Sequence, residues 1–301
     1  MPPEGLTRSI ELHKALSSKP PRQITQEAFD YNDEHLRRLA RLSPGDVARA
    51  SDLWEYTQDL LYTDIQSDLF VFLLPFCLEA WRQDLLGISQ EYGGFVEHLY
   101  SVLANRHVFD EHLKSAQTIA VSQFMRLSIL EEIRNQCGLS YERGHERPYR
   151  WLRAMTSYGV LLPDLNQLWK DWWAITSTGS AIAAVQYVAC LMYAMNENPV
   201  FAPWTPDKGG GPPCLWEFEG HLYTNRWLET NVTFLEQTLS PKSVSDLLAR
   251  AVEKLIGQPE HKKASEVLAD LPLCSSTLEN RCARLPQILR TVQQPGVLFD
   301  W

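Results

Sequence analysis

The chain has 301 residues, of which 45% are hydrophobic and 11% aromatic, a composition typical of a packed globular protein and not of a disordered one. Its 28 Lys and Arg against 37 Asp and Glu give a formal net charge of −9, which argues against nucleic-acid binding and favours a basic protein partner. The chain begins with no secretion signal, no apolar run reaches the roughly 20 residues of a membrane span, and the six cysteines form no CxxC motif. We therefore expect a cytoplasmic protein with reduced thiols, no cofactor and no membrane association.

The first half of the chain predicts an arm followed by helices. Residues 1–24 are rich in Pro, Ser and Lys and are expected to form a flexible N-terminal arm, followed by a single helical domain over 25–301. Ser43-Pro44-Gly45-Asp46 signals a turn or a helix start, and a helix is predicted from there to about Leu61, with a break near 62–64. The later segments predict a helix that begins or kinks at Pro75, helices over 90–103 and 110–137, and an exposed connector with a soft domain boundary over 141–150.

The second half continues the helical pattern. Ser177-Thr178-Gly179-Ser180 is predicted to cap an apolar helix that runs to about residue 196, and Trp169, Trp172 and Trp173 form a helical stripe expected in the core. Residues 215–224 alternate apolar and polar side chains around Gly220 and predict a small β-hairpin. Further helices are predicted over 149–158, 226–239, 241–256, 259–271 and 277–292. The fold class is therefore mainly α, a large multi-helix globule with at most that hairpin.

One window of the sequence contains acidic residues but no basic ones. From Ala50 to Trp81 there are six acidic residues and no Lys, Arg or His. On a helical wheel Asp52, Glu55 and Asp59 share one face, and the apolar residues lie on the other side. An acidic helix face of this kind suits a surface that binds a basic partner. We therefore predict that Asp52, Glu55 and Asp59 contact the partner.

A second group of candidate partner-binding residues surrounds the glycine run 209–211. Trp204 and Trp216 flank this run, and Asp207, Glu217 and Glu219 lie beside them in the sequence. Exposed aromatic side chains next to acids are typical of the energetic centre of a protein interface. The predicted set is Trp204, Trp216, Glu217 and Glu219.

The sequence contains no catalytic motif, and only one group of residues suggests a metal site. The glycine run is followed by Pro212-Pro213 instead of a helix N-terminus, so it does not match a phosphate-binding loop, and no GxSxG pattern occurs. A metal ion needs three or four converging ligands. The densest group of possible ligands is His107, Asp110, Glu111 and His112, and it leaves an all-α metal-dependent enzyme as an alternative.

The segment Ser67-Asp68-Leu69-Phe70-Val71-Phe72-Leu73-Leu74-Pro75-Phe76-Cys77-Leu78-Glu79-Ala80-Trp81 resembles a helical "FxFLLPxxLE" run in immunity proteins, the cognate inhibitors encoded beside bacterial polymorphic toxins. The resemblance covers about 30 residues and transfers no site residues. It implies a bacterial binding protein that occludes a basic partner such as a toxin domain. A metal-dependent enzyme, or a scaffold or adaptor protein, remains the alternative.

Overall fold

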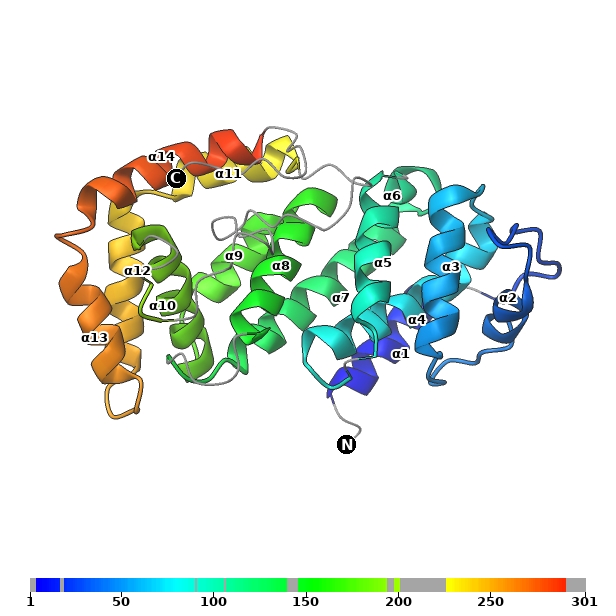
Figure 1. The fold of residues 1–301 in the computed structure, drawn as a ribbon, viewed down its shortest axis with the longest axis horizontal. Coiled ribbons are helices and arrows are strands. Elements are labelled where there is room, and N and C mark those ends of the chain that lie inside the picture. The colour runs from blue at the N-terminus through cyan, green and yellow to red at the C-terminus, as the bar shows by residue number, and fades with distance from the viewer. Residues whose placement is uncertain are drawn as a thin grey trace. The chain divides into compact units, whose positions relative to one another are not determined.

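The computed structural model describes residues 4–16, 19–89, 91–105, 107–139, 146–193, 198–200 and 226–290. Within these ranges the chain forms fourteen helices and no strand, which confirms the predicted mainly α fold (Figure 1). The predicted hairpin over 215–224 lies outside the described residues. The chain divides into two compact units, Met1–Ser128 (unit 1) and Ile129–Trp301 (unit 2), and the division falls inside one long helix. The prediction of a single helical domain over 25–301, with a soft boundary at 141–150, stays a prediction.

Unit 1 is built around one apolar helix, α4, which runs uninterrupted from Ser67 to Leu85 with Pro75 inside it. Its side chains are buried along nearly its whole length, including Phe70, Leu74 and Trp81. Helices α1 and α5 both pack against α4, and α2 and α5 pack against α3. The helices of this unit are α1 (Glu4–Leu16), α2 (Glu34–Leu39), α3 (Ala50–Tyr62), α4, α5 (Gly93–Asn105), α6 (Val108–Glu111) and the first part of α7 (Ser115–Arg134).

Two elements of unit 1 differ from the sequence-based prediction. The expected flexible arm contains helix α1, whose Leu12 and Leu16 are buried, so burial of apolar side chains orders a segment that composition alone marked as loose. Helix α3 begins at Ala50 and not at Pro44. Ser43 starts a tight turn instead: its carbonyl accepts from the Asp46 amide at 2.9 Å, and Gly45 has a φ of 100°, which glycine adopts without strain. The predicted break after α3 is confirmed, because α3 ends at Tyr62.

Unit 2 packs around α10, which contacts α9, α12, α13 and α14. The predicted cap of this helix is confirmed: the Ser177 hydroxyl accepts from the Ser180 amide at 3.1 Å, and the Ser180 hydroxyl accepts from the Ser177 amide at 2.9 Å. Trp169 and Trp172 are buried beside Tyr187 of α10, as the stripe predicts. The helices are α8 (Glu146–Leu161), α9 (Leu165–Trp173), α10 (Thr178–Met192), α11 (Glu229–Thr238), α12 (Pro241–Lys254), α13 (His261–Asp270) and α14 (Ser275–Leu289).

Two features of α10 bear on its surroundings. A Cβ atom added at Gly179 would lie 2.0 Å from the carbonyl oxygen of Arg134, so the end of α7 approaches the start of α10 as closely as only glycine allows. Among the described helices, none is by itself long and apolar enough to cross a membrane. Helices α9 and α10 reach that length and composition only together, and they are bent by 111° where they meet.

Candidate functional site

The acidic face of α3 is turned toward α2, where a guanidinium group meets it. The Asp52 side chain is 4% exposed and accepts hydrogen bonds from Arg38, at 2.7 Å from Nη2 to Oδ1 and 3.0 Å from Nε to Oδ2. Arg38 also pairs with Glu34 one turn earlier in α2, at 2.9 Å. A planar guanidinium that holds a carboxylate with two nitrogens fixes the relative position of the two helices. Asp52 therefore joins α2 to α3.

His35, one turn before Leu39 in α2, is 1% exposed and lies between two further acids of α3. Its Nε2 atom is 2.6 Å from Asp59 Oδ2, and its Nδ1 atom is 3.1 Å from Glu55 Oε2. Burial alone lowers the pKa of the ring, but the hydrogen bond to Asp59 and the charges of Asp59, Glu55 and Asp30 outweigh it and raise the pKa of His35. The hydrogen bond of Nε2 to Asp59 and the nearby charge of Glu55 favour the charged imidazolium, although Nδ1 itself makes no hydrogen bond among the described residues.

The second oxygen of Asp59 holds the segment that precedes α2. Asp59 Oδ1 accepts from the Phe29 amide at 2.8 Å. Further along, Gln66 Oε1 accepts from the amides of Thr25 and Gln26 at 2.7 and 3.0 Å, and Thr63 Oγ1 donates to the Glu27 carbonyl at 3.1 Å. We call residues 23–31 the strap. Because side chains of α3 and the α3–α4 connection take up its backbone groups, the strap is held in one conformation without belonging to a helix.

Three aromatic rings are exposed along the strap and at the end of α3. Tyr31 is 98% exposed, Tyr62 51% and Phe29 48%, and the rings of Phe29 and Tyr62 lie with their centroids 4.6 Å apart. Tyr31 has a φ of 63°, a left-handed conformation that costs free energy in a non-glycine residue. A strained backbone that presents a tyrosine to solvent indicates a role for that ring outside the fold. We call Phe29, Tyr31 and Tyr62 the aromatic patch.

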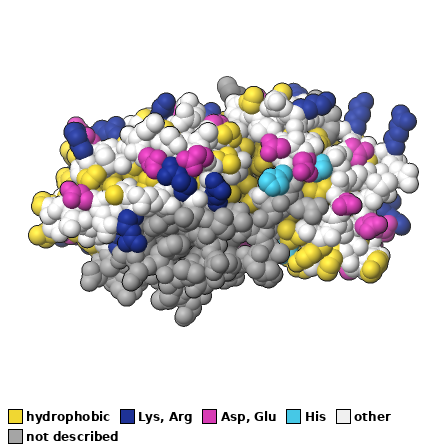
Figure 2. Space-filling view, turned by 90° about the horizontal axis from the view of Figure 1, so that it is seen from above, with side chains coloured by type: hydrophobic (Ala, Val, Ile, Leu, Met, Phe, Trp, Pro, Cys, Tyr) yellow, Lys and Arg dark blue, Asp and Glu magenta, His cyan; other side chains and the backbone are white. Residues whose placement is uncertain are grey.

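The segments that carry the aromatic patch are acidic, although the exposed Arg22 and Arg37 border the first of them in the sequence. The two segments that carry it, 23–36 and 50–81, contain no Lys or Arg. Exposed carboxylates beside the rings in the sequence are Glu27, Asp30 and Asp64. Figure 2 shows acidic and basic side chains interspersed, with hydrophobic ones between them, over one face of the molecule.

The structure gives a different environment to the acids that were predicted to contact a partner. Asp52 and Asp59 are 3% and 2% exposed, so the prediction that they form an open acidic face is wrong. Their charges are used inside unit 1, by Arg38 and His35. Glu55 is the exception, since 36% of its side chain is exposed. The other predicted partner-binding residues, Trp204, Trp216, Glu217 and Glu219, lie outside the described residues.

The alternative metal site does not assemble in the described part of the chain. Asp110 and Glu111 are exposed on the short helix α6, and His107 precedes it with a φ of 50°. His112 turns to α4 instead, where its Nδ1 atom is 2.7 Å from Ser67 Oγ. The described residues contain no group of three or more His, Cys, Asp or Glu side chains that could hold a metal ion. His112 lies 3.9 Å from Glu111, but no third ligand joins this pair in the described part of the chain.

The aromatic patch was not predicted from the sequence, although the composition of one segment indicated it. Residues 23–36 include four acids, two aromatic residues and no Lys or Arg, but they lie partly within the segment expected to be an arm. Comparisons with protein-family models, with curated proteins and with solved structures give no match to this chain. The candidate site is therefore defined by the hydrogen-bonded strap, three exposed rings and exposed carboxylates next to them in the sequence.

Proposed function

We propose that this chain is a binding protein that takes a basic protein partner on the aromatic patch. The observation that carries the proposal is the combination of three exposed aromatic rings with a strap held by Asp59, Thr63 and Gln66. Tyrosine is enriched among the residues that dominate binding energy in interfaces. A surface already fixed in one conformation loses little entropy when it binds. The patch therefore has the two properties expected of an interface centre.

The charge of the surrounding residues supports a basic partner. Lys and Arg side chains stack on Tyr and Phe rings, with about 0.5–1 kcal/mol for each exposed contact and more when water is excluded. Glu27, Asp30 and Asp64 provide carboxylates for the same side chains, and no lysine or arginine in 23–36 or 50–81 competes for them. Such charges mainly raise the rate of association and select the sign of the partner.

The mode of action we propose is inhibition by occlusion. A partner that holds its own anionic substrate with Lys and Arg loses that substrate when the same side chains lie on the aromatic patch. The resemblance of the α4 segment to immunity proteins agrees with this mode of action, and so does the net charge of −9. Under this proposal Asp52 and Asp59 do not contact the partner. They position the helix and the strap that present the rings.

A site-specific cross-link tests the proposal. The photoreactive residue p-benzoylphenylalanine replaces Tyr31, and in a control chain it replaces Leu273, which is 84% exposed on unit 2. Both proteins are expressed in the native host and irradiated. We expect one protein with a basic isoelectric point to cross-link at position 31 and not at position 273. Cross-linking of acidic proteins, or equal products from both positions, contradicts the proposal.

A further inference from the structure

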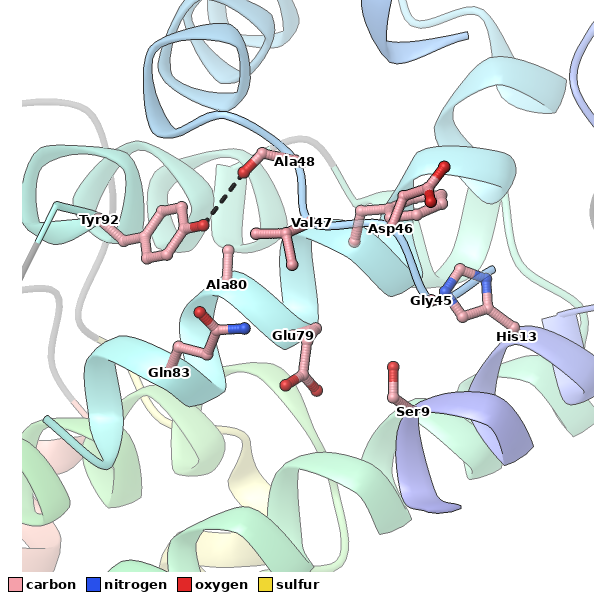
Figure 3. A pocket seen from close by; sticks show the side chains of 11 residues that line it. Ser9, His13, Gly45, Asp46, Val47, Ala48, Glu79, Ala80, Gln83 and Tyr92 are labelled. Carbon is pink, nitrogen blue, oxygen red and sulfur yellow. Dashed lines mark hydrogen bonds between the residues drawn. The ribbon is translucent and has the colours of Figure 1, made fainter. Parts of the chain in front are cut away.

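Unit 1 contains a pocket that the aromatic patch does not use. It has a volume of about 170 Å³ and lies between α1, the turn after Ser43, α4 and Tyr92 (Figure 3). A single water needs about 10–15 Å³ by this measure, so the pocket has room for several waters or for a small ligand. The size suits a small metabolite and not a peptide.

Polar groups enter the pocket from two helices. Ser9 and His13 are one turn apart on α1, and Glu79 and Gln83 are one turn apart on α4. Figure 3 shows these four side chains around the same space, with Val47 and Ala80 on the side toward Ala48 and Tyr92. Because α1 packs against α4, both pairs of polar side chains line the same pocket.

Ser9 is the residue that most directly indicates a ligand. It is 8% exposed, lines the pocket, and makes no hydrogen bond within the described part of the chain. The hydroxyl is not itself a fully buried atom, so water in the pocket can satisfy it, and a polar atom of an occupant can replace that water.

The residues that line the pocket favour a positive charge on the polar group of the occupant. None of the eleven described residues that line the pocket is Lys or Arg, whereas Asp46 and Glu79 are carboxylates. Burial lowers the pKa of His13, so its ring is neutral at pH 7 and offers a lone pair. Glu79 also contacts Arg82, at 3.2 Å. Burial is the largest cause of the raised pKa of Tyr92, and the negative charges of Glu91 and Glu79 raise it further. The pocket is therefore rich in acceptors and negative in sign.

An apolar wall completes the pocket. Phe76 contributes an aromatic ring that also meets His13, at 4.7 Å between centroids, and Tyr92 is fixed by a hydrogen bond of 3.1 Å from its hydroxyl to the Ala48 carbonyl. Val47 and Ala80 add aliphatic surface. Rings and aliphatic groups of this kind cover the alkyl part of a ligand whose charged end is held by the polar side chains.

We propose that this pocket binds a small primary alkylammonium ion, with its ammonium group among Glu79, Ser9 and His13 and its alkyl chain against Phe76 and Tyr92. An ammonium group donates three hydrogen bonds and accepts none, which matches a lining of a carboxylate, a hydroxyl and a neutral imidazole. The inference does not depend on the function proposed for the aromatic patch, since the two sites share no residue.

Three isosteric probes test the class of ligand on the full-length protein. Butylammonium, butan-1-ol and butyrate have similar size and differ in the charge of the polar end. Their binding is measured by isothermal titration calorimetry at pH 7.5. We expect butylammonium to bind at least tenfold more tightly than either of the others. Equal affinities for all three, or no binding of butylammonium at 50 mM, overturn the proposal.

Two variants and a control locate the site. Glu79→Gln removes the carboxylate and is expected to weaken butylammonium binding about tenfold, as for a hydrogen bond to a charged group. Ser9→Val fills part of the pocket without touching the Glu79–Arg82 pair, so it tests the site even if Glu79→Gln disturbs folding, which circular dichroism detects. Glu11→Gln removes the same charge from the exposed surface of α1 and should bind as the wild type does. Wild-type affinity in Ser9→Val places the ligand elsewhere and contradicts the proposal.

Discussion

The removal of Asp59 should destabilise unit 1 far more than the removal of Glu55, although both are acids of α3 that face His35. Asp59 is 2% exposed and accepts from two groups, the His35 ring and the Phe29 amide. Loss of one partner of a buried ion pair costs about 3–5 kcal/mol. Two hydrogen bonds to a charged acceptor, at about 1.5–3 kcal/mol each, give a similar figure. We therefore expect Asp59→Ala to lower the free energy of unfolding by about 3–5 kcal/mol.

Glu55→Gln is the matched control. Its side chain is 36% exposed and lies 3.1 Å from the other ring nitrogen of His35, so water screens much of the interaction. Exposed ion pairs contribute about 0–1 kcal/mol, and we expect a loss in that range. Urea unfolding measured by hydrogen exchange on peptides from α2 and α3 reports the stability of this region directly. Equal losses in the two variants, or a loss below about 1 kcal/mol in Asp59→Ala, refute the reasoning.

The same network predicts a dependence on pH. The pKa of His35 is raised above its usual 6.5, so its contribution to stability is complete below pH 6.5 and is lost as the pH rises through the folded-state pKa. Burial lowers the pKa values of His13 and His98, whose contributions have the opposite sign. Asp59→Asn keeps the size of the side chain and removes the charge. The difference in stability between wild type and Asp59→Asn should therefore shrink as the pH rises above 6.5.

Two further predictions concern close packing and thiol reactivity. Gly179→Ala should destabilise unit 2 by about 1–3 kcal/mol in thermal unfolding, because the new Cβ atom would lie 2.0 Å from a backbone oxygen. Gly94→Ala is the control. Its Cβ atom would lie 3.5 Å from Trp54, an ordinary contact distance, so this variant should be neutral or stabilising. Burial raises the pKa of the Cys77 and Cys282 thiols to about 12, so neither should react with iodoacetamide at pH 8 in the folded protein, whereas the exposed Cys137 should. Modification of Cys77 at the rate of Cys137 would contradict the packing of α4.

Local patterns predicted much of the helical structure. The cap at Ser177 was predictable because its partner Ser180 is three residues away, and the Trp169 stripe was predictable because helical periodicity fixes which side chains share a face. The start of α3 was not, because Pro44 and Gly45 suit a turn as well as a helix start. Helix α1 was missed because its order comes from packing against α4 and not from its own composition.

The candidate site required distances across the fold. The periodicity of Asp52, Glu55 and Asp59 is correct, and they do share a face of α3. Their environment depends on Arg38 and His35, which precede Asp52 and Asp59 by 14 and 24 residues, so no local pattern shows that this face is covered by α2. The strap likewise depends on hydrogen bonds from Gln66 to residues 40 and 41 positions earlier. Charge composition drew attention to α3, but it could not show that Asp52 and Asp59 are buried while Phe29, Tyr31 and Tyr62 are exposed.

We propose that the exposed rings on the strap bind a basic protein. The most direct measurement is the affinity of the cross-linked partner, once purified, for wild type, Tyr31→Ser and Leu273→Ser, by calorimetry at 50 and 300 mM salt. We expect Tyr31→Ser to weaken binding at least about thirtyfold, as for an interface residue that contributes about 2 kcal/mol or more. Leu273→Ser should leave the affinity unchanged. The affinity of the wild type should fall as the salt concentration rises. Wild-type affinity in Tyr31→Ser, or affinity that does not depend on salt, would contradict the account.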